Sequence, residues 1–545
     1  YNFNLLYAVE NNPNTCWIGC TNELNAGYAA DGYARMRGYG ALITTYGVGE
    51  LSAMNAIAGS LAENVPVISI VGVPATKTIE NKTCVHHNFQ DVDYHACYEA
   101  HKHVTAAAAF LTRDNAKMEI DRVLKTFVKE RKPVYIAVPL DIAKMEISDK
   151  EVSYDWISDE ETLRLVSNKI AAKINNAQKP VILGDLLVKR FDSRIEYKEF
   201  VEKTRIPTTN FLMGTNLIDM DYDLYLGGYY AGFENPTAEK YVNETDCLIA
   251  VGPVYTDLNA FGFNLPYKIN NQIAIYGTHT YVEGEKYDNV KMSDVLEAGK
   301  KNVYLILKPA IGYEHKASSP DALTSEYIYP RLQEFIKDND IIVAETGIIP
   351  HGVAPMKFPA TAELQTQTLW GSIGWATPAA LGVCLAKPKS RVILITGEGS
   401  HQLTAMEIGN MLRRGVKPIV IVLNNKGYTI ERVLSETPED CFNDIMQMNY
   451  SKFARVFEGD VWSTKVSTAD DFDKALKVTQ IMNKMCYIEI CTEAMDMPKL
   501  TQDLIANFKS KAPKIEAVKK EEPVKLENSG SMAFETTVHK GFTEE

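Results

Sequence analysis

The segment RVILITGEGSHQLTAMEIGNMLRRGVKPIVIVLNNKGYTIE, residues 391–431, contains two short apolar runs separated by a helix-like stretch. The runs at 392–395 and 419–423 are typical of parallel strands that are buried on both faces. Between them, apolar residues recur at helical spacing, at Leu403, Met406, Ile408, Met411 and Leu412. The segment therefore predicts a strand–helix–strand unit of a doubly wound α/β domain, with both strands ending at the same edge of a parallel sheet.

Polar turns follow both predicted strands at that edge. Glu398 lies between two glycines, the second of them Gly399, and Asn425 follows the second strand two residues before Gly427. A carboxylate, an amide oxygen and the backbone carbonyl of Gly427 are ligands of the kind that Mg²⁺ prefers, commonly together with phosphate oxygens. Ser400 begins the helix, whose N-terminal amides attract anions. Each turn taken alone is more typical of a plain tight turn, so both readings stay open at this point.

Length and composition indicate a globular protein of several domains. The chain has 545 residues, of which 46% are hydrophobic and 23% are charged. A net charge of −13 gives no electrostatic basis for binding nucleic acid or an anionic membrane, and the longest apolar runs are too short for a transmembrane helix. Nine scattered cysteines without a C-x-x-C pair indicate reduced thiols and a cytoplasmic location. The chain starts at Tyr1 without a methionine, which leaves room for a removed targeting segment.

Three segments of the chain repeat a strand–helix rhythm, and polar stretches around 148–161 and 308–325 separate them. The predicted α/β domains are 1–155, 160–310 and 325–508. The expected strands are Ala41–Thr45, Pro66–Val71, Pro133–Val138, Pro180–Leu183, Cys247–Val251, Gln272–Tyr276, Asp340–Ala344, Arg391–Ile395, Pro418–Leu423 and Cys486–Ile490. Residues 509–545 are rich in Lys, Glu and Pro, which predicts a disordered tail.

Longer motifs extend over nearly the whole chain, up to the tail. They are GCTNELNAGYAADGYARMRG at 19–38, TTYGVGELSAMNAIAGSLAENVPV at 44–67, AETGIIPHG at 344–352, LWGSIGWATPAALG at 369–382 and NNKGYTIE at 424–431. Together with the spacing of 27 positions from Glu398 to Asn425, these motifs resemble the thiamine-diphosphate-dependent 2-oxo acid decarboxylases, closest to the pyruvate decarboxylases. The resemblance implies a pyrimidine-binding, a central and a diphosphate-binding domain, with thiamine diphosphate and Mg²⁺ as cofactors.

The chemistry of such enzymes explains the residue types. Decarboxylation of a 2-oxo acid leaves an acyl carbanion, which needs an electron sink that the thiazolium ring supplies and no side chain does. The resemblance implies that Glu23 holds N1′ of the aminopyrimidine ring, although sequence alone would make it an ordinary acid at a helix N-terminus. It also implies that Val48 packs on that ring, that Gly371 offers its backbone oxygen to the 4′-amino group, and that Ile373 bends the cofactor.

The remaining cofactor contacts implied by the resemblance lie on the predicted diphosphate-binding domain. Glu398, Asn425 and the backbone of Gly427 would hold Mg²⁺ against the diphosphate. The other residues that match cofactor-binding positions of the family are Thr346, Ser372, Gly399, Ser400, Tyr428, Thr429 and Ile430.

The resemblance assigns proton transfer to His86, His87 and Glu431. Imidazoles and a partly desolvated carboxylate can be tuned to exchange protons near neutral pH. Adjacent histidines are otherwise more typical of a surface loop, but here they precede FQDVDYHACY, a segment as long as its counterpart in the family. We assign His95, His101 and His103 to the surface or the core, since no Cys or acid cluster accompanies them. The aliphatic residues at the positions where the family lines its substrate pocket are Pro350, Ile430 and Leu434.

The chain departs from the family at several positions. Glu398 is longer by one methylene than the family's aspartate, so a metal bond would need a retracted rotamer or a bridging water. Ile348 replaces a hydroxyl residue beside the diphosphate, residues 88–90 replace Thr-Leu-Gly after the histidine pair, and Leu187 replaces a cysteine linked to substrate activation in some yeast-type enzymes. The family's catalytic aspartate would lie one position before Tyr1, so we expect the sequence to be a truncated record.

The expected function is non-oxidative decarboxylation of pyruvate to acetaldehyde and CO₂. The resemblance implies a homodimer, further assembled into a tetramer, in which Glu23 of one subunit and Glu398 of another serve the same cofactor. One alternative is a bulkier substrate, phenylpyruvate or indolepyruvate. A carboligase similar to acetolactate synthase is disfavoured by Glu431 and the histidine pair. An alternative of another class is a catalytically silent relative with an assembly or regulatory role, to which Glu398 and Ile348 would point.

Overall fold

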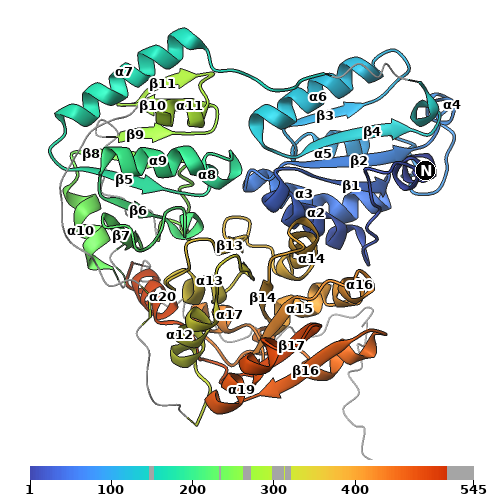
Figure 1. Ribbon diagram of the computed structural model, residues 1–545. Helices are drawn as coiled ribbons and strands as arrows, with labels where there is room; N and C mark the ends of the chain where they lie inside the picture. Colours follow the sequence, from blue (N-terminus) through green and yellow to red (C-terminus); the bar gives the residue numbers. More distant parts are fainter. Residues whose placement is uncertain are drawn as a thin grey trace, which may run out of the picture.

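The computed structural model describes residues 1–146, 152–231, 233, 235–261, 272–297, 312–313 and 321–511. They form three α/β domains, each built on a sheet of mainly parallel strands with helices on its faces (Figure 1). The first domain, in blue, stands beside the central domain, in green, and the third domain, in yellow to red, lies below both (Figure 1). The predicted fold class is therefore confirmed.

The first domain contains a four-stranded sheet of order β1-β2-β4-β3, in which all neighbours are parallel. Its strands are β1 (Gly40–Thr45), β2 (Val67–Val73), β3 (Ala107–Phe110) and β4 (Val134–Pro139). Its helices are α1 (Phe3–Asn11), α2 (Glu23–Arg37), α3 (Val48–Ala62), α4 (Thr76–Glu80), α5 (Ala96–His101) and α6 (Ala116–Glu130).

The central domain contains a seven-stranded sheet of order β11-β10-β9-β8-β5-β6-β7. Five strands are parallel, whereas β10 and β11 form an antiparallel hairpin that the sequence did not predict. The strands are β5 (Pro180–Gly184), β6 (Thr208–Asn210), β7 (Tyr225–Gly228), β8 (Cys247–Val251), β9 (Gln272–Ile275), β10 (His279–Val282) and β11 (Glu285–Asp288). The helices are α7 (Glu160–Asn176), α8 (Leu187–Arg190), α9 (Arg194–Thr204), α10 (Pro236–Glu244) and α11 (Met292–Glu297).

The third domain contains a fully parallel six-stranded sheet of order β13-β12-β14-β15-β17-β16. Its strands are β12 (Ile341–Ala344), β13 (Glu363–Thr366), β14 (Val392–Gly397), β15 (Ile419–Asn424), β16 (Val461–Val466) and β17 (Met485–Cys491). Its helices are α12 (Ser325–Phe335), α13 (Ile349–Val353), α14 (Ala376–Ala386), α15 (Glu398–Thr404), α16 (Glu407–Arg413), α17 (Thr429–Leu434), α18 (Tyr450–Phe453), α19 (Ala469–Thr479) and α20 (Lys499–Lys511). Both faces of β14 and β15 are buried, as a strand covered by helices on two sides requires.

All ten expected strands are present within one or two residues, but the single helix predicted between β14 and β15 is wrong. The structure has two helices, α15 and α16, with a break at 405–406. Leu403 and Met406 are 54% and 52% exposed, whereas Ile408 and Met411 are buried as predicted. The predicted tail begins too early, because α20 continues to Lys511. The rest of the predicted tail and most of the two predicted linkers lie outside the described residues.

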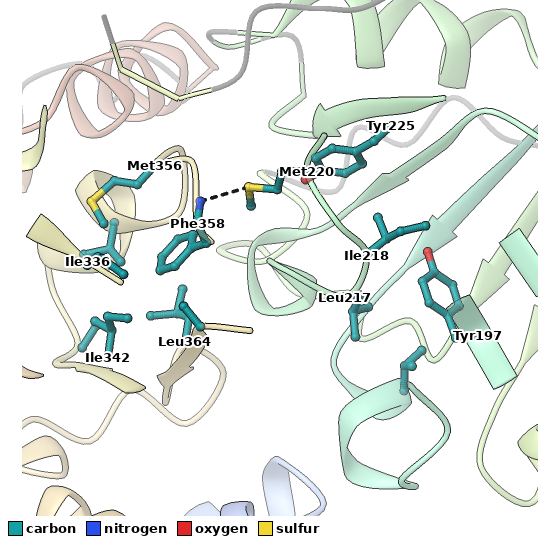
Figure 2. Packing of buried hydrophobic residues seen from close by; sticks show 14 of the residues in the cluster. Tyr197, Leu217, Ile218, Met220, Tyr225, Ile336, Ile342, Met356, Phe358 and Leu364 are labelled. Atoms are coloured by element: carbon teal, nitrogen blue, oxygen red, sulfur yellow. Dashed lines mark hydrogen bonds between the residues drawn. The ribbon is translucent and has the colours of Figure 1, made fainter. Parts of the chain in front are cut away.

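The central and third domains share one hydrophobic core. A single cluster of buried residues extends from Tyr197 and Tyr225 in the central domain to Ile342 and Leu364 in the third (Figure 2). At the boundary, the backbone N–H of Phe358 donates to the Met220 thioether over 3.3 Å. Because no layer of solvent separates these residues, we expect the two domains to move as one body.

Buried charges connect all three domains. Arg35 donates to Asp31 over 2.6 Å and to Glu63 over 2.8 Å, all within the first domain. Arg190 of the central domain donates to the backbone oxygen of Glu63, and the indole N–H of Trp375 in the third domain donates to Asp31. All four charged side chains are buried. Two cations therefore balance two anions at the point where the domains meet.

Helix α2 of the first domain and helix α14 of the third approach each other so closely that their backbones touch. A Cβ atom added at Gly32 would lie 2.2 Å from the backbone oxygen of Ala379. One added at Gly382 would lie 2.0 Å from the backbone oxygen of Ala29. Because both obstacles are backbone atoms, neither can rotate away, and glycine is required at both positions.

We expect Gly382→Ala to lower the free energy of unfolding by about 1–3 kcal/mol, since the added methyl must push the two helices apart. Urea unfolding of the cofactor-free protein measures this change. Gly397→Ala is a matched control, because a Cβ at Gly397 would meet nothing within 4 Å. Equal stability of the Gly382 variant and the control would contradict the close approach of α2 and α14.

Candidate active site

The two polar turns of residues 391–431 meet at the carboxyl edge of the third sheet. Glu398 follows β14, Asn425 follows β15, and these strands are parallel neighbours, with Gly397 beside Leu423. Glu398 is the first residue of α15 and is only 1% exposed. Its Oε1 accepts the backbone N–H of Gly427 over 2.7 Å. The strand register therefore brings together the three residues predicted to bind a metal.

The side-chain amide of Asn425 lies close to both the Gly427 carbonyl and the Glu398 carboxylate, so the three residues could share one cation. In one orientation of its amide, Asn425 places Oδ1 2.7 Å from the Gly427 carbonyl oxygen and 3.3 Å from Glu398 Oε2. Without a cation, the amide gains hydrogen bonds by turning over, so that its NH₂ group donates to both oxygens and its oxygen accepts from Thr429. A cation among the three oxygens favours the first orientation, so the donor set fits Mg²⁺.

Burial governs the protonation of Glu398. It raises the pKa of the carboxyl to about 7, although hydrogen bonds from Gly427 and neighbouring backbone amides act in the opposite direction. Among the described residues, no group of three or more His, Cys, Asp or Glu side chains is placed to hold a metal. A site at Glu398 would thus depend on amide, carbonyl and ligand oxygens for its other contacts.

Residues 367–373 form a second segment of the candidate site, beside the turns of Glu398 and Asn425. The backbone oxygen of Gln367 accepts from Thr346 Oγ1 over 3.0 Å and from the N–H of Gly371 over 3.1 Å, and its side-chain oxygen accepts from the N–H of Ser372. Ser372 Oγ also lies 2.5 Å from the hydroxyl of Tyr28 on α2. These bonds attach the segment that carries Gly371 and Ser372 to the end of β12 and to the first domain. Ile373, at its tip, is 37% exposed.

Glu345 is a supporting residue that the sequence analysis missed. It directly follows β12, is fully buried, and accepts hydrogen bonds from the backbone N–H groups of Thr346 and Ala376. Burial raises the pKa of its carboxyl to about 7. The signal that identified Glu398, a polar residue directly after an apolar strand, applies equally to Glu345 and would have found it. Gln367 carried no such signal, because no pattern in the sequence relates it to its partners Thr346, Gly371 and Ser372, the first of which is 21 residues away.

The other predicted cofactor and pocket residues lie around these turns. The ring of Tyr428 packs on the backbone of Gly399, since a Cβ there would lie 2.5 Å from it and would force the ring to move. Ser400 is buried, as are Thr429 and Pro350, whereas Ile430 is partly buried against the core and Leu434 is half exposed. Ile348 is buried in the shared hydrophobic core, so an apolar contact replaces the hydroxyl that the family has there. Leu187 is likewise a core residue.

Glu23 and Val48 lie on the first domain. Glu23 begins α2, whose N-terminus is capped by the side chain of Asn22 accepting the N–H of Asn25 over 2.8 Å. Its carboxylate is partly buried, and Oε1 lies 3.4 Å from the position of a Cβ at Gly49. Val48 begins α3 and is 58% exposed. Glu23 therefore lies beside the turn after β1 that carries Val48.

His86 and His87 lie on an exposed loop of the first domain. Their rings meet edge to face, with centroids 4.6 Å apart. The hydroxyl of Tyr46 donates to the backbone oxygen of His86, and His87 adopts φ +73°, a left-handed conformation that is unusual outside glycine. The pKa of His87 is lowered, mainly by partial desolvation and to a lesser extent by the neighbouring imidazole of His86. Glu431, the remaining predicted proton-transfer residue, is exposed on α17 of the third domain.

The histidines that we assigned to surface or core occupy such places. His95 and His103 are exposed and His101 is buried. Two further buried histidines lie in the third domain. His401, on α15, has Nδ1 2.9 Å from Thr377 Oγ1 and Nε2 2.9 Å from the hydroxyl of Tyr487. Burial lowers the pKa of His401, as well as that of His351, to about 4.

These values predict how stability responds to acid. A histidine of the unfolded chain has a pKa near 6.5, so between pH 6.5 and 4 the unfolded chain binds the extra proton. As the pH falls through that window, each buried histidine therefore lowers the free energy of unfolding, by on the order of 3 kcal/mol per histidine over the whole window. Glu345 and Glu398, whose pKa values are raised, have the opposite effect and gain stability as the pH falls from 7.

We therefore expect the free energy of unfolding of His401→Gln, which lacks one titrating group, to rise by roughly 2–3 kcal/mol relative to that of the natural chain between pH 7.5 and pH 4.5. Chemical denaturation at both pH values measures this difference. His103→Gln, at an exposed position, should show no such change. Parallel pH dependence of the His401 variant and the natural chain would contradict a neutral buried imidazole.

Of the described residues, none belongs to a helix long and apolar enough to cross a membrane. Comparison with known proteins covers all three domains. Residues 1–97, 167–292 and 350–490 match the family models described as thiamine pyrophosphate enzyme N-terminal TPP binding domain, central domain and C-terminal TPP binding domain, respectively.

Similar proteins align over most of the chain. Pyruvate decarboxylase isozyme 1 of Saccharomyces cerevisiae is 33% identical over 522 residues, which cover 92% of each chain. Pyruvate decarboxylase of Kluyveromyces lactis is 33% identical, over 91% of this chain and 92% of its own. An alpha-keto-acid decarboxylase of Mycobacterium avium is 31% identical, over 93% of this chain and 92% of its own.

Proposed function

Because this chain belongs to the thiamine-diphosphate-dependent 2-oxo acid decarboxylases, with pyruvate decarboxylases among its relatives, we propose that its substrate is pyruvate, released as acetaldehyde and CO₂. The family assignment makes the chain an enzyme, so the alternative of a catalytically silent relative is set aside. The observation that carries the proposal is the convergence of Glu398, Asn425 and Gly427 at one sheet edge.

We assign the binding of Mg²⁺ to this cluster. Glu398 and Asn425 would contribute side-chain oxygens and Gly427 a carbonyl oxygen, with diphosphate oxygens completing the coordination. Ser400 and Gly399 at the start of α15, together with Thr346, Ser372, Tyr428 and Thr429, would line the cofactor. When bound, thiamine diphosphate supplies the electron sink for decarboxylation. Gly371 would direct its backbone oxygen to the 4′-amino group, and Ile373 would press against the cofactor between its rings.

Proton transfer is assigned to the first domain and to α17. Glu23 would hold a proton between its carboxylate and N1′ of the pyrimidine, in contact with Val48. His86, His87 and Glu431 would exchange protons with the substrate carbon and oxygen. The lowered pKa of His87 keeps this imidazole neutral near pH 7, so it can accept a proton there.

We propose that the active unit is a homodimer, assembled further into a tetramer. Several apolar side chains that flank the site are open to solvent in the single chain, among them Val48, Leu51, Trp370, Leu403 and Met406. Contact with a second copy would cover them and place Glu23 of one subunit opposite Glu398 of the other. The nine cysteines, all within the described residues, are free thiols, which supports a cytoplasmic location.

The predicted pocket residues favour a short substrate. Pro350, Ile430 and Leu434 are aliphatic, and bulky side chains at the last two positions restrict the length of the acid. We expect pyruvate and 2-oxobutanoate to show the highest kcat/KM, since each methylene that fits or clashes changes binding by roughly 1–3 kcal/mol. Aldehyde release with a panel of 2-oxo acids, thiamine diphosphate and Mg²⁺ measures this. A higher kcat/KM for phenylpyruvate or indolepyruvate would replace pyruvate by an aromatic substrate, and release of no aldehyde from any acid would refute the proposal.

A further inference from the structure

Glu50 is a buried carboxylate of the first domain without an assigned role. It lies in the first turn of α3 and is 2% exposed. Its Oε1 accepts the backbone N–H of Gly47 over 2.7 Å, and its Oε2 accepts the hydroxyl of Tyr135 on β4 over 2.8 Å. His101 Nδ1 lies 3.5 Å from the same Oε2. Glu50 thus holds the turn before α3 to the side chains behind it, and its burial keeps it away from substrate.

The turn that Glu50 holds touches a predicted proton-transfer residue on one side. Gly47 adopts φ +64°, and a Cβ at this position would lie 2.1 Å from the backbone oxygen of His87. The loop that carries His86 and His87 therefore packs directly on the backbone of Gly47. Its neighbour Tyr46 donates its hydroxyl to the backbone oxygen of His86, which fixes the loop at a second point.

The same turn touches another predicted proton-transfer residue on its other side. Two residues after Gly47, a Cβ at Gly49 would lie 3.4 Å from Glu23 Oε1. Val48, between the two glycines, is the residue assigned to the pyrimidine ring. Gly47 therefore packs on the loop of His87, Gly49 lies beside Glu23, and Val48, which is assigned to the cofactor, stands between them. The side chain of Glu50 holds this turn through the N–H of Gly47.

We infer that Glu50 is a positioning residue, which fixes the turn at 47–49 and through it the relative placement of Glu23, Val48 and His87. This inference rests on the proposed function, since that proposal gives Glu23 and His87 their proton-transfer roles. A residue at 50 must reach the N–H of Gly47 with an oxygen while meeting the hydroxyl of Tyr135. Glutamine meets both requirements, because its oxygen can accept from Gly47 and its NH₂ can donate to Tyr135; alanine and aspartate cannot span the distance.

Substitutions at Glu50 separate positioning from charge and from stability. In the cofactor-loaded enzyme, Glu50→Ala should lower kcat by roughly 10²-fold, the effect of misplacing reacting groups by about 1 Å, and should shift the acid limb of the pH profile. Glu50→Gln should restore kcat and the profile. Glu50→Asp keeps the charge but falls short of Gly47, so it should behave as alanine does and replaces it if that variant does not fold.

A matched control measures what the loss of a buried carboxylate does on its own. Asp340 is also buried, accepts from Arg391 and from the N–H of Lys337, and lies at the opposite, amino end of β12. Asp340→Ala should lower thermal stability without changing kcat of the loaded enzyme. An equal loss of kcat in the Asp340 and Glu50 alanine variants would overturn the positioning role.

A second readout does not depend on decarboxylation. The rate at which diethyl pyrocarbonate modifies His87 in the cofactor-free protein, followed by mass spectrometry against pH, reports the placement and pKa of this exposed imidazole. Glu50→Ala or Glu50→Asp should change that rate, and Glu50→Gln and Asp340→Ala should not. An unchanged rate in the alanine and aspartate variants would overturn the inference. If the natural chain releases no aldehyde, the proposed function fails, while the labelling still tests whether Glu50 fixes the turn.

Discussion

Replacement of Glu23 by glutamine is expected to lower kcat by ~10²–10⁴-fold while the fold and most cofactor binding are retained. Asn22 still caps α2 in this variant, and the amide, which has the size of the carboxylate, still lies beside the turn at Gly49, so packing is preserved. It cannot stabilise a protonated pyrimidine, because it carries no negative charge and cannot accept the proton. Turnover of pyruvate in the loaded enzyme measures the loss, and thiamine diphosphate binding is measured in parallel.

The control for Glu23 is another acidic residue at the first position of a helix, away from the proposed site. Glu160 also stands in the first position of a helix, α7, which belongs to the central domain, whereas the proposed site is built on the first and third domains. Glu160→Gln removes a charge that stabilises the helix dipole and should leave kcat unchanged. Near-normal decarboxylation by the Glu23 variant would show that this acid only stabilises its helix, which is the reading that the sequence favours in the absence of the family resemblance.

The second large effect is expected at Glu398. Glu398→Ala should abolish Mg²⁺-dependent retention of thiamine diphosphate, because the cluster with Asn425 and Gly427 loses its only carboxylate. Titration of Mg²⁺ while cofactor binding is followed measures this loss. If the alanine variant titrates with Mg²⁺ as the natural protein does, Glu398 is not a ligand and the two turns serve only the fold.

Glu398→Asp, which restores the family's residue, is the sharper test. In the structure, Glu398 Oε1 reaches the N–H of Gly427, and Oε2 faces Asn425. The shorter aspartate falls short of both contacts unless the backbone moves, and Mg²⁺ requires ligand distances near 2.1 Å. We therefore expect this variant to weaken Mg²⁺-dependent binding on the order of 10-fold. Tighter binding would mean that the turns are built for aspartate and that glutamate is accommodated under strain.

The strands that the sequence predicts are those whose burial shows in local composition. β14 and β15 are continuous runs of Val, Ile and Leu covered on both faces. β3 consists of three alanines and a phenylalanine, and its small side chains give a weak apolar signal. β16 lies at a sheet edge, only Ser463 and Val466 of its residues are buried, and serine, threonine and lysine interrupt its apolar pattern. A continuous apolar run therefore reveals a strand, whereas burial alone does not: β6 and β7 are buried throughout, but they are short and contain Thr, Asn or Gly.

The candidate site shows the same limit. The meeting of Glu398 with Gly427 was predictable, since parallel neighbouring strands end at one edge. The support from Glu50 was not, because its partner Tyr135 is 85 residues away and no local pattern relates them. The break at 405–406 was also hidden, because Leu403 and Met406 fit a continuous helix by spacing although both face solvent. Contacts between residues far apart in the sequence, and the packing of each helix on its sheet, decide these features.

The buried charges at the domain junction bear on how the chain is made. Trp375 follows Asp31 by 344 residues, so at about 5–20 residues per second a ribosome needs roughly 20–70 s to supply this partner. Arg190, which donates to Glu63, arrives within that interval. During synthesis, the surface of α2 that later packs on the third domain therefore stays exposed, and chaperones or other nascent chains can bind it. Slower translation between Arg190 and Trp375 should lengthen that exposure and lower the yield of folded enzyme.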